Sequence, residues 1–343
     1  MTPAVDTEVL VVGGGPIGLA AAIEARLAGR EVVVVEPRPS PVDKACGEGL
    51  LPGTLRGLRR LEVDPAGWDL RGISYRSAAG RHVDHAFRTG PGRGVRRTTL
   101  HAALGARADA LGVARVTGRV TAIAQDDDGV TAAGVRARWL LAADGLHSTV
   151  RRLVGLERRL PARGRRFGLR RHLPLAPWTD LVEVHWGAGA EAYVTPVGPD
   201  LVGVAVLGPP HTDWDATLAA LPRLAARLDG CRPVGPVLGA GPLRQTTTAR
   251  TRGRVALVGD ASGYVDALTG EGLRVGLAQA RAAVETLGDP AAYERAWRAV
   301  TRDYRVLTTG LVGWAASPLR RAIVPVAIGV PGVYGGVVER LAR

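Results

Sequence analysis

The sequence predicts an α/β fold, α+β overall, in which a Rossmann-type nucleotide-binding domain carries an antiparallel-sheet domain and C-terminal helices. Three observations predict it. Apolar runs followed by glycine clusters begin at Val9 and again at Val255, and short runs separated by Gly, Pro and Asp fill residues 159–245. The 343 residues are 46% hydrophobic, which is ample for a large core.

The first glycine cluster has the spacing of a dinucleotide-binding turn. Val9 to Val12 form a continuous apolar run, which is typical of a parallel strand covered on both faces. After it, Gly13 permits the turn, Gly15 lets a pyrophosphate approach the backbone, and Gly18 lets helix and strand pack closely. The free N–H groups and the dipole at the start of the helix would then bind the phosphates.

A second apolar run ends in an acidic residue. Val32 to Val35 form the predicted second strand, and Glu36 closes it. A carboxylate at this position binds a ribose hydroxyl pair and repels a 2′-phosphate, so the site is predicted to bind a dinucleotide other than NADP. The pattern alone does not choose between NAD and FAD.

The second glycine cluster, GDASGYVDALTGEG, follows another predicted strand, Val255 to Val258. A carboxylate at the end of a buried strand, here Asp260, is costly unless it is hydrogen-bonded, and a ribityl hydroxyl would satisfy it. Gly270 and Gly272 would let backbone N–H groups approach a planar ring at the start of a helix. The dipole of that helix favours negative charge on the ring.

Two further motifs complete a resemblance to a known superfamily. RWLLAADGLHSTVRR contains Asp144-Gly145 after an apolar strand, and RRTTLHAAL places Arg97 at Arg-x-x-Leu-x-x-x-Leu spacing with Leu100 and Leu104. Together with the glycine clusters, these motifs resemble those of FAD-dependent aromatic hydroxylases (class A flavoprotein monooxygenases) and geranylgeranyl reductases, which share one fold. The resemblance implies FAD as cofactor and NAD(P)H as a transient co-substrate.

The FAD site that this resemblance implies draws on residues from most of the chain. They are Gly13, Gly15, Pro16, Gly18, Glu36, Arg38, Cys46, Gly47, Arg97, Val120, Asp144, Asp260, Gly270, Gly272 and Leu273. Two alternatives stay open. Asp144 and Ser148 would also serve to cap a helix after the strand, and Arg97 would also form a surface salt bridge.

The resemblance also implies an organisation in segments. The FAD-binding domain would comprise residues 1–75, 90–158 and 246–290. A substrate-binding β-sheet domain would occupy residues 159–245, and a helical segment would follow at residues 291–343.

The stretch DKACGEGL follows the second strand and should pass close to the flavin. Cys46-Gly47 resembles the Cys-Gly stretch of geranylgeranyl reductases. The chain has two isolated cysteines and no Cys-x-x-Cys pair, so close packing of Cys46 at the ring edge is favoured over a redox role. Glu48 is a candidate proton donor or acceptor near the substrate, and a helix-start acid is the alternative.

The predicted sheet supplies two more candidates. LVEVHW alternates, which puts Glu183 and His185 on one face of its strand and Trp186 on the other. His185 and Tyr193 would bind or deprotonate a substrate hydroxyl, and the alternatives are a histidine on the sheet surface and a core tyrosine with a satisfied hydroxyl. YVTP replaces the Trp-x-Trp-x-Ile-Pro of flavin-dependent halogenases, so halogenation is disfavoured.

The net charge of +13 comes almost entirely from arginine. The arginines are scattered and no nucleic-acid motif accompanies them, so nucleic acid is not expected as a partner. The densest run, residues 151–171, is either a solvated face or a landing patch for a pyridine nucleotide or an acidic carrier protein. The isolated cysteines and the lack of signal-peptide features in the N-terminal residues predict a cytoplasmic protein, and no metal site is predicted.

The C-terminal segment has two parts. Every third or fourth residue from Tyr293 to Leu307 is apolar, which predicts a helix with one buried stripe. Residues 322–338 carry no charge but contain two prolines, and they are short for a membrane span. They are predicted to form a lid or wall of an apolar substrate tunnel; the alternative is a segment that touches a membrane and makes the protein peripheral to it.

The favoured function is that of an FAD-dependent monooxygenase, which hydroxylates a lipophilic aromatic or polyketide-type substrate through a flavin C4a-hydroperoxide. This follows from the resemblance, which implies that NAD(P)H reduces the flavin transiently. The Cys-Gly stretch and the apolar tail support the first alternative, a reductase that saturates isoprenoid C=C bonds. A protein that binds FAD without turnover is the second alternative.

Overall fold

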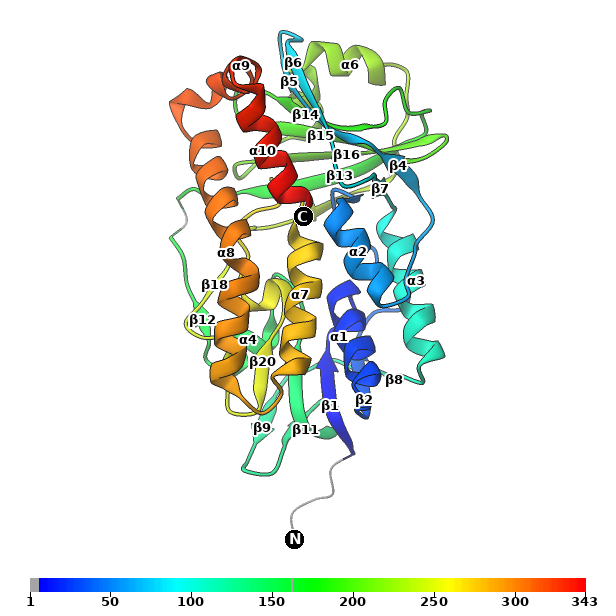
Figure 1. Cartoon of the computed structure of the whole chain (residues 1–343), viewed down its shortest axis with the longest axis vertical. Coiled ribbons are helices and arrows are strands. Elements are labelled where there is room, and N and C mark those ends of the chain that lie inside the picture. The colour runs from blue at the N-terminus through cyan, green and yellow to red at the C-terminus, as the bar shows by residue number, and fades with distance from the viewer. Residues whose placement is uncertain (1–5, 162) are drawn as a thin grey trace.

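The computed structural model describes residues 6–161 and 163–343 and has two main sheets with helices packed around them (Figure 1). One half of the molecule holds a mostly parallel sheet and the other half an antiparallel one. The long helix α8 (Pro290–Ala315) runs along both halves. The predicted α/β architecture is therefore confirmed.

The mostly parallel sheet has the strand order β19-β20-β11-β1-β2-β8, with β10 and β9 added beside β11. Its central strands are rich in Val and Leu and buried on both faces, because helices or strands cover each side. The bounds are β1 (Thr7–Val12), β2 (Val32–Glu36), β8 (Ala114–Thr117), β9 (Ile123–Gln125), β10 (Val130–Ala132), β11 (Val135–Ala142), β19 (Thr251–Arg252) and β20 (Val255–Leu257).

Helices cover one face of this sheet in a single core cluster, and α1 packs against both α3 and α7. Gly15 precedes the first of these helices, and Pro16 occupies its first turn, where its missing N–H would have no partner in any case. The helices of this half are α1 (Pro16–Leu27), α2 (Pro52–Arg60), α3 (Arg97–Ala110), α4 (Thr149–Leu153), the 3₁₀ turn η1 (Gly259–Ser262) and α7 (Gly272–Glu285).

The second sheet has the order β17-β13-β16-β15-β14-β5-β6. All of its pairs are antiparallel except β14 with β5, so the predicted antiparallel strands are present. Its bounds are β5 (Gly72–Ser77), β6 (His82–Ala86), β13 (Phe167–Leu173), β14 (Leu181–Trp186), β15 (Glu191–Gly198), β16 (Leu201–Gly208) and β17 (Val234–Ala240). It therefore recruits β5, whose first residues lie in the segment 1–75 assigned above to FAD binding.

Short elements complete the fold. Two small sheets join β3 (Gly49–Leu50), β7 (Gly92–Gly94) and β4 (Trp68–Leu70), and β12 (Glu157–Arg158) with β18 (Thr246–Thr247). Helices α5 (Trp214–Ala219) and α6 (Pro222–Leu228) pack on one face of the second sheet.

The C-terminal elements η2 (Pro318–Ala322), α9 (Ile323–Gly329) and α10 (Pro331–Ala342) end the chain beside β5 and β6. The predicted stripe of α8 is present, since Tyr293, Trp297 and Tyr304 are all buried. Among the described residues, no single helix has the length and hydropathy needed to cross a membrane. The pair formed by α8 and residues 318–329 meets these criteria jointly, but it is bent by 101°.

Candidate functional site

Four loops meet at one edge of the parallel sheet. Strands β1, β2, β11 and β20 run parallel, so their carboxyl ends lie together, which is where ligands bind in open α/β sheets. Gly13, Asp144 and Asp260 follow three of these ends, and Glu36 is the last residue of β2. The structure thus brings together predicted site residues that are up to 247 positions apart in the sequence.

The first glycine loop leaves no space for side chains at two of its positions. Gly13 has φ +105°, and a Cβ there would lie 2.5 Å from the carbonyl oxygen of Ala143. A Cβ on Gly18 would lie 1.7 Å from the carbonyl oxygen of Gly13. At Gly15 the nearest atom would be a guanidinium nitrogen of Arg97, at 3.8 Å. The turn is therefore tight on its protein side and open on the side where a phosphate would bind.

Glu36 is held by four hydrogen bonds. Its carboxylate accepts from the backbone N–H of Gly14 at 2.8 Å and from the backbone and guanidinium of Arg38. Burial would raise the pKa of Glu36, but these bonds outweigh it and lower the pKa below its usual value. Four donors fill the capacity of a carboxylate, so a ribose diol must displace part of the Arg38 fork to bind here.

Asp144 and Ser148 cap α4, as the structural alternative predicted. Asp144 Oδ2 accepts from the N–H of Val150 at 3.0 Å, and Ser148 Oγ accepts from the N–H of Arg151 at 2.9 Å. The other carboxylate oxygen of Asp144 is buried and has no partner among the described residues. This oxygen is therefore an acceptor still available to a ligand, so capping and binding are compatible.

Arg97 begins α3, and its guanidinium points back to the glycine loop. The alternative expectation was a surface salt bridge, but Arg97 forms no salt bridge with the described residues. Its Nε is buried and has no hydrogen-bond partner among them. The sequence motifs did not single out its neighbour His101, which is buried and donates its Nε2–H to the carbonyl oxygen of Gly14 at 2.8 Å. Burial lowers the pKa of His101, so a neutral imidazole supports the loop.

Asp260 and Lys44 influence each other through their charges. Burial raises the pKa of Asp260, against the opposing effects of Arg97 and Lys44. Burial, followed by the charges of Arg38 and Arg97, lowers the pKa of Lys44. Its ammonium nitrogen would lie 3.4 Å from a Cβ on Gly145. The prediction omitted Lys44, although a signal existed: it is the only lysine among 45 basic residues.

The remaining predicted cofactor residues differ in whether their backbone or their side chain is accessible to a ligand. Gly270 has φ +68° with open space around it, and Gly272 begins α7. Leu273 is partly buried in the core beneath α7. The side chain of Val120 is buried in the core of the parallel sheet, so only its backbone is available to a ligand. Cys46 is half-buried and forms no disulfide.

Strand β15 contacts both loops expected to flank the flavin. Tyr193 donates its hydroxyl hydrogen to the carbonyl oxygen of Leu268 at 3.0 Å, and Thr195 donates to the carbonyl oxygen of Gly47 at 2.9 Å. Burial raises the pKa of Tyr193 well above its usual value. This tyrosine is therefore a neutral phenol with a satisfied hydroxyl, as its alternative described.

His185 lies on the opposite face of the same sheet from Tyr193. Cross-strand partners share a face, and His185 pairs with Ala192, whereas Tyr193 pairs with Val184. His185 hydrogen-bonds Glu183 at 2.8 Å, which confirms their shared face. The imidazole is buried on the side covered by α5 and α6, away from the glycine loops, so it is neither exposed nor beside Tyr193.

Glu48 links the cofactor loop to the second sheet and lies outside any helix, since α2 begins at Pro52. It is 2% exposed, accepts from the backbone N–H of Arg97 at 2.8 Å and hydrogen-bonds His172 Nε2 at 2.6 Å. His172 Nδ1 lies 3.0 Å from Arg170, which can only donate, so Nδ1 accepts and Nε2–H donates to Glu48. The sequence did not single out His172.

A second buried group of charges ties the cofactor loop to the sheet. Arg166 contacts both Glu191 and Asp266, with 2.9 Å to the latter, and Arg320 contacts the other oxygen of Glu191 at 2.5 Å. All four side chains are at least nine-tenths buried. With Arg151 and Arg170, Arg166 shows that part of the arginine-rich run 151–171 is internal rather than a solvated face.

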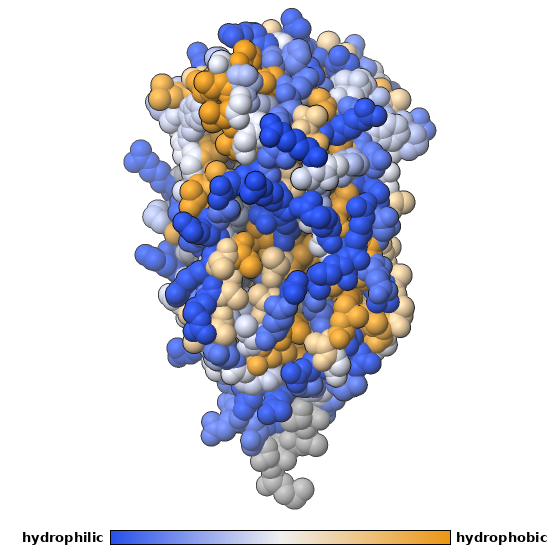
Figure 2. Space-filling model, in the orientation of Figure 1, coloured by the Kyte–Doolittle hydropathy of each residue, from blue (hydrophilic) through white to orange (hydrophobic). Residues whose placement is uncertain are grey.

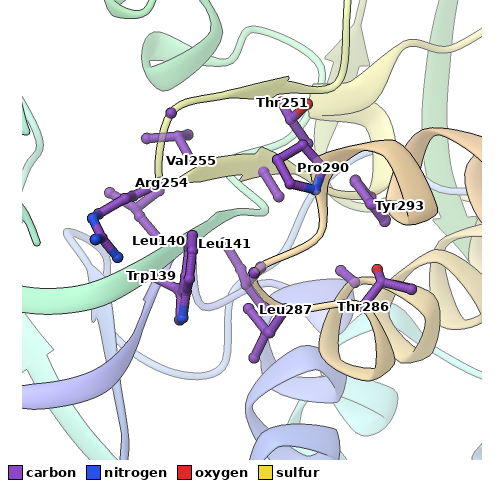
Figure 3. Close-up of a pocket in the computed structure, with 14 residues that line it drawn as sticks. Trp139, Leu140, Leu141, Thr251, Arg254, Val255, Thr286, Leu287, Pro290 and Tyr293 are labelled. Atoms are coloured by element: carbon purple, nitrogen blue, oxygen red, sulfur yellow. The ribbon is translucent and has the colours of Figure 1, made fainter. Parts of the chain in front are cut away.

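A recess elsewhere in the parallel domain is not part of this site. It lies between β11, β20 and the turn from α7 to α8 (Figure 3), and its lining includes Trp139, Val255, Leu287 and Tyr293. None of its residues comes from the loops that follow the carboxyl ends of the strands.

Comparison with known proteins agrees with this geometry. A family described as FAD binding domain matches residues 6–295. The chain belongs to this family. It is 31% identical over 339 residues to a menaquinone reductase from Mycolicibacterium smegmatis, covering 87% of this chain and 80% of the reductase. It is 29% identical over 321 residues to the ubiquinone hydroxylase UbiL of Rhodospirillum rubrum, covering 82% and 72%.

The fold is also that of a solved monooxygenase. The structure of p-nitrophenol 4-monooxygenase from Pseudomonas putida superposes with a TM-score of 0.83 at 21% identity, covering 99% of this chain and 97% of that one. The protein is therefore a flavoprotein of the FAD-dependent hydroxylase and geranylgeranyl reductase superfamily, and an FAD-dependent oxidoreductase. NAD(P)H is the usual reductant in this family.

The chain's own residues fit FAD. Gly13, Gly15 and Gly18 form a turn open to a pyrophosphate, and Arg97 supplies positive charge beside it. Lys44 adds a second positive charge near Gly145 and Asp260. The unpartnered oxygen of Asp144 offers an acceptor that a ligand hydroxyl would satisfy. Bound FAD would supply the redox chemistry, while the protein supplies binding, orientation and exclusion of water.

Proposed function

We propose that the protein is an FAD-dependent monooxygenase that hydroxylates a lipophilic aromatic or polyketide-type substrate, with NAD(P)H as transient reductant. The observation that carries this proposal is the buried Glu48–His172 pair, which joins the cofactor loop to the face of the sheet that bears Tyr193 and Thr195. Hydroxylation of a phenol is helped by a group that accepts its proton.

The surroundings of Glu48 suit an acceptor rather than a donor. Arg97 donates its backbone N–H, His172 donates Nε2–H, and a guanidinium nitrogen of Arg170 lies 3.8 Å away. Both carboxylate oxygens of Glu48 therefore act as hydrogen-bond acceptors. In the proposed mechanism Glu48 takes up the substrate proton, His172 positions its carboxylate, and the buried apolar side chains around Tyr193 exclude water from the reacting atoms.

A test of the reaction compares oxygen and substrate consumption. The probes are a panel of alkyl-substituted phenols and hydroquinones, assayed with NADH and with NADPH. Substrate-stimulated NAD(P)H oxidation, with ¹⁸O from ¹⁸O₂ in the product, is the expected result. Tight yellow FAD without turnover of any probe would contradict the proposal and favour a protein that binds FAD without catalysis.

A test of the residues uses two matched glutamates. Glu48 and Glu183 are both buried and both hydrogen-bonded to a histidine, but they lie on opposite sides of the sheet. Glu48→Gln should lower the hydroxylation rate by about tenfold or more, the range of a lost proton acceptor, and shift its pH profile while the flavin spectrum is kept. Glu183→Gln should leave the rate per folded molecule unchanged. Equal effects of the two variants would contradict the role of Glu48.

A reductase that saturates isoprenoid C=C bonds is the second candidate. It is favoured by the similarity to menaquinone reductase over 87% of the chain and by the half-buried thiol of Cys46 beside the site. Substrate reduction that persists without O₂, and that is lost in Cys46→Ser, would support this candidate and overturn hydroxylation.

A further inference from the structure

The C-terminal helices carry an unusual amount of exposed apolar surface. Of the large hydrophobic side chains that are exposed in the structure, half lie within 28 positions of one another, between 306 and 333. They are Val306, Leu319, Val326, Val330 and Val333, and we call them the C-terminal apolar patch. Figure 2 shows apolar surface gathered at the end of the molecule where α9 and the end of α8 lie in Figure 1.

The charges within the segment that bears the patch have one sign. Between Asp303 and Glu339 the chain contains no acidic residue, and its only charged side chains are Arg305, Arg320 and Arg321. Arg320 is buried against Glu191, whereas Arg305 and Arg321 are exposed. Acidic residues lie at its margins, since Asp303 is one turn before Val306 in α8 and Asp84 of β6 acts on Tyr334. An apolar face that itself carries arginine and no acid is complementary to an apolar layer with a negatively charged surface.

The same helices are anchored on their other side. Ile323, Val324 and Ala327 are buried, and Tyr334 donates its hydroxyl hydrogen to the carbonyl oxygen of Ile73 at 2.9 Å. The patch is therefore the outer face of a fixed element. The α8–α9 pair is bent by 101°, which suits a segment that lies on a membrane rather than one that crosses it.

The apolar core beneath the patch continues to the cofactor loop. One cluster of buried side chains contains Ile323 and Val324 of α9 together with Trp186 of the sheet and Leu268 of the loop before α7. Tyr193 packs against the same cluster. The side of the molecule that bears the patch is thus joined to the proposed substrate side by continuous apolar packing.

We infer that the C-terminal apolar patch docks the protein on the surface of an anionic lipid bilayer, from which it takes its substrate. The inference deepens the proposed function and rests on it in one respect: the substrate is lipophilic. A bilayer is favoured over an acidic carrier protein because aliphatic side chains dominate the patch. No acidic residue in this segment would repel lipid phosphates.

Vesicle co-sedimentation of the full-length FAD-loaded protein tests the inference. Phosphatidylglycerol vesicles should pellet the wild type, and phosphatidylcholine vesicles should pellet much less of it. The double variant V326D/V333D should lose about tenfold or more of its partitioning, because it removes apolar contact and adds repulsion. The matched control is Val234→Asp in β17, at a valine whose exposure lies between those of Val326 and Val333, on the sheet edge opposite to β6. It should bind as the wild type does.

Three outcomes would overturn the inference. Wild-type protein that stays in the supernatant with both lipids shows that the patch does not bind bilayers. Equal pelleting of V326D/V333D and the wild type shows that another surface binds. A dimer in sedimentation velocity that V326D/V333D abolishes, without lipid binding, assigns the patch to a second copy. Vesicle binding without turnover of any probe would leave the docking intact and remove only the proposed function.

Discussion

The two sides of the site are built by different physical means. The nucleotide side is made of backbone: glycines whose missing side chains create the turn, and strand ends that deliver Glu36, Asp144 and Asp260 to one edge. The sheet side is made of buried paired charges, Glu48 with His172 and Arg166 with Glu191. On the nucleotide side, a side chain added at Gly13 or Gly18 would clash with the backbone. On the sheet side, removal of one charged residue would leave its partner buried without an opposite charge.

This difference determines how each side fails. A substitution in a glycine turn causes a local steric clash, so it should lower cofactor affinity before it lowers global stability. A buried ion group fails electrostatically, because removing one partner leaves another charge buried without compensation, so the loss should appear first in global stability. The predictions below use this distinction, beginning with the largest effect.

Arg166→Met should have the largest effect. It leaves Asp266 buried without its ion-pair partner and Glu191 with Arg320 alone, and the expected loss in the free energy of unfolding is about 3–5 kcal/mol. The measurement is urea unfolding of the holoprotein. Arg165→Met, the same change at the exposed neighbouring residue, should cost less than about 0.5 kcal/mol. Similar losses in both variants would mean that the network does not stabilise the fold.

Gly18→Ala should act on the cofactor before the fold. The added Cβ would lie 1.7 Å from the carbonyl oxygen of Gly13, so the glycine loop must move and the FAD dissociation constant should rise about 100-fold, or roughly 2.7 kcal/mol. Fluorescence titration of the apoprotein with FAD measures this. Gly310→Ala in α8 has no atom within 4 Å of its Cβ and should leave FAD affinity unchanged while stabilising by up to about 1 kcal/mol.

The same distinction explains what could be predicted from the sequence. Gly13, Gly15 and Gly18 form a local pattern, and an apolar strand before a carboxylate is visible within ten residues, so the nucleotide side was predictable. The pairs on the sheet side join residues 124 apart for Glu48–His172 and 100 apart for Arg166–Asp266. No local pattern indicates such partners, because the fold alone brings them together.

His185 shows where strand periodicity stops being informative. Alternation correctly placed it on the face of Glu183. Which face meets the cofactor depends on the neighbours of β14 and on the helices that cover each side, and alternation holds no information about either. Tyr193 lies on the other face for this reason, and the catalytic candidates proposed together are separated by the sheet.

Asp260→Asn should remove from the apoprotein the free-energy penalty of a buried carboxylate. Burial raises the pKa of Asp260, so the folded apoprotein binds its proton more tightly than the unfolded chain does. The free energy of unfolding of the wild type therefore falls as pH rises above about 3.8, whereas Asn has no such loss. The variant's advantage should be absent below about pH 3.8 and should grow as pH rises from there to the raised pKa of folded Asp260.

With FAD bound, the wild type should be more stable than Asp260→Asn. Removing a charge-assisted acceptor should weaken FAD binding by about tenfold, the range of a hydrogen bond to a charged group. Unfolding curves of apo and FAD-loaded proteins at several pH values measure both effects. A variant that gains no stability as pH rises would show that the charge of Asp260 is already compensated by Arg97 and Lys44.

Lys44→Gln should have the smallest effect. Lys44 belongs neither to the glycine turns nor to the buried charge pairs, because it contributes a positive charge without forming a turn or an ion pair. Its ammonium group interacts with Asp260 and Glu36, so it should contribute about 1 kcal/mol to FAD binding, or roughly fivefold in affinity. The loss should shrink in 1 M NaCl because the contribution is electrostatic.

The pH dependence gives Lys44 a separate signature. Burial and the charges of Arg38 and Arg97 lower its pKa below 10.5, so Lys44 loses its charge at a lower pH than an ordinary lysine. The advantage of the wild type over Lys44→Gln in FAD affinity should therefore decline as pH rises through the alkaline range. Arg30→Gln, which removes a surface charge paired with Glu8, should change FAD affinity at no pH. A fixed difference between wild type and Lys44→Gln at every pH and salt concentration would show that Lys44 acts by packing rather than by charge.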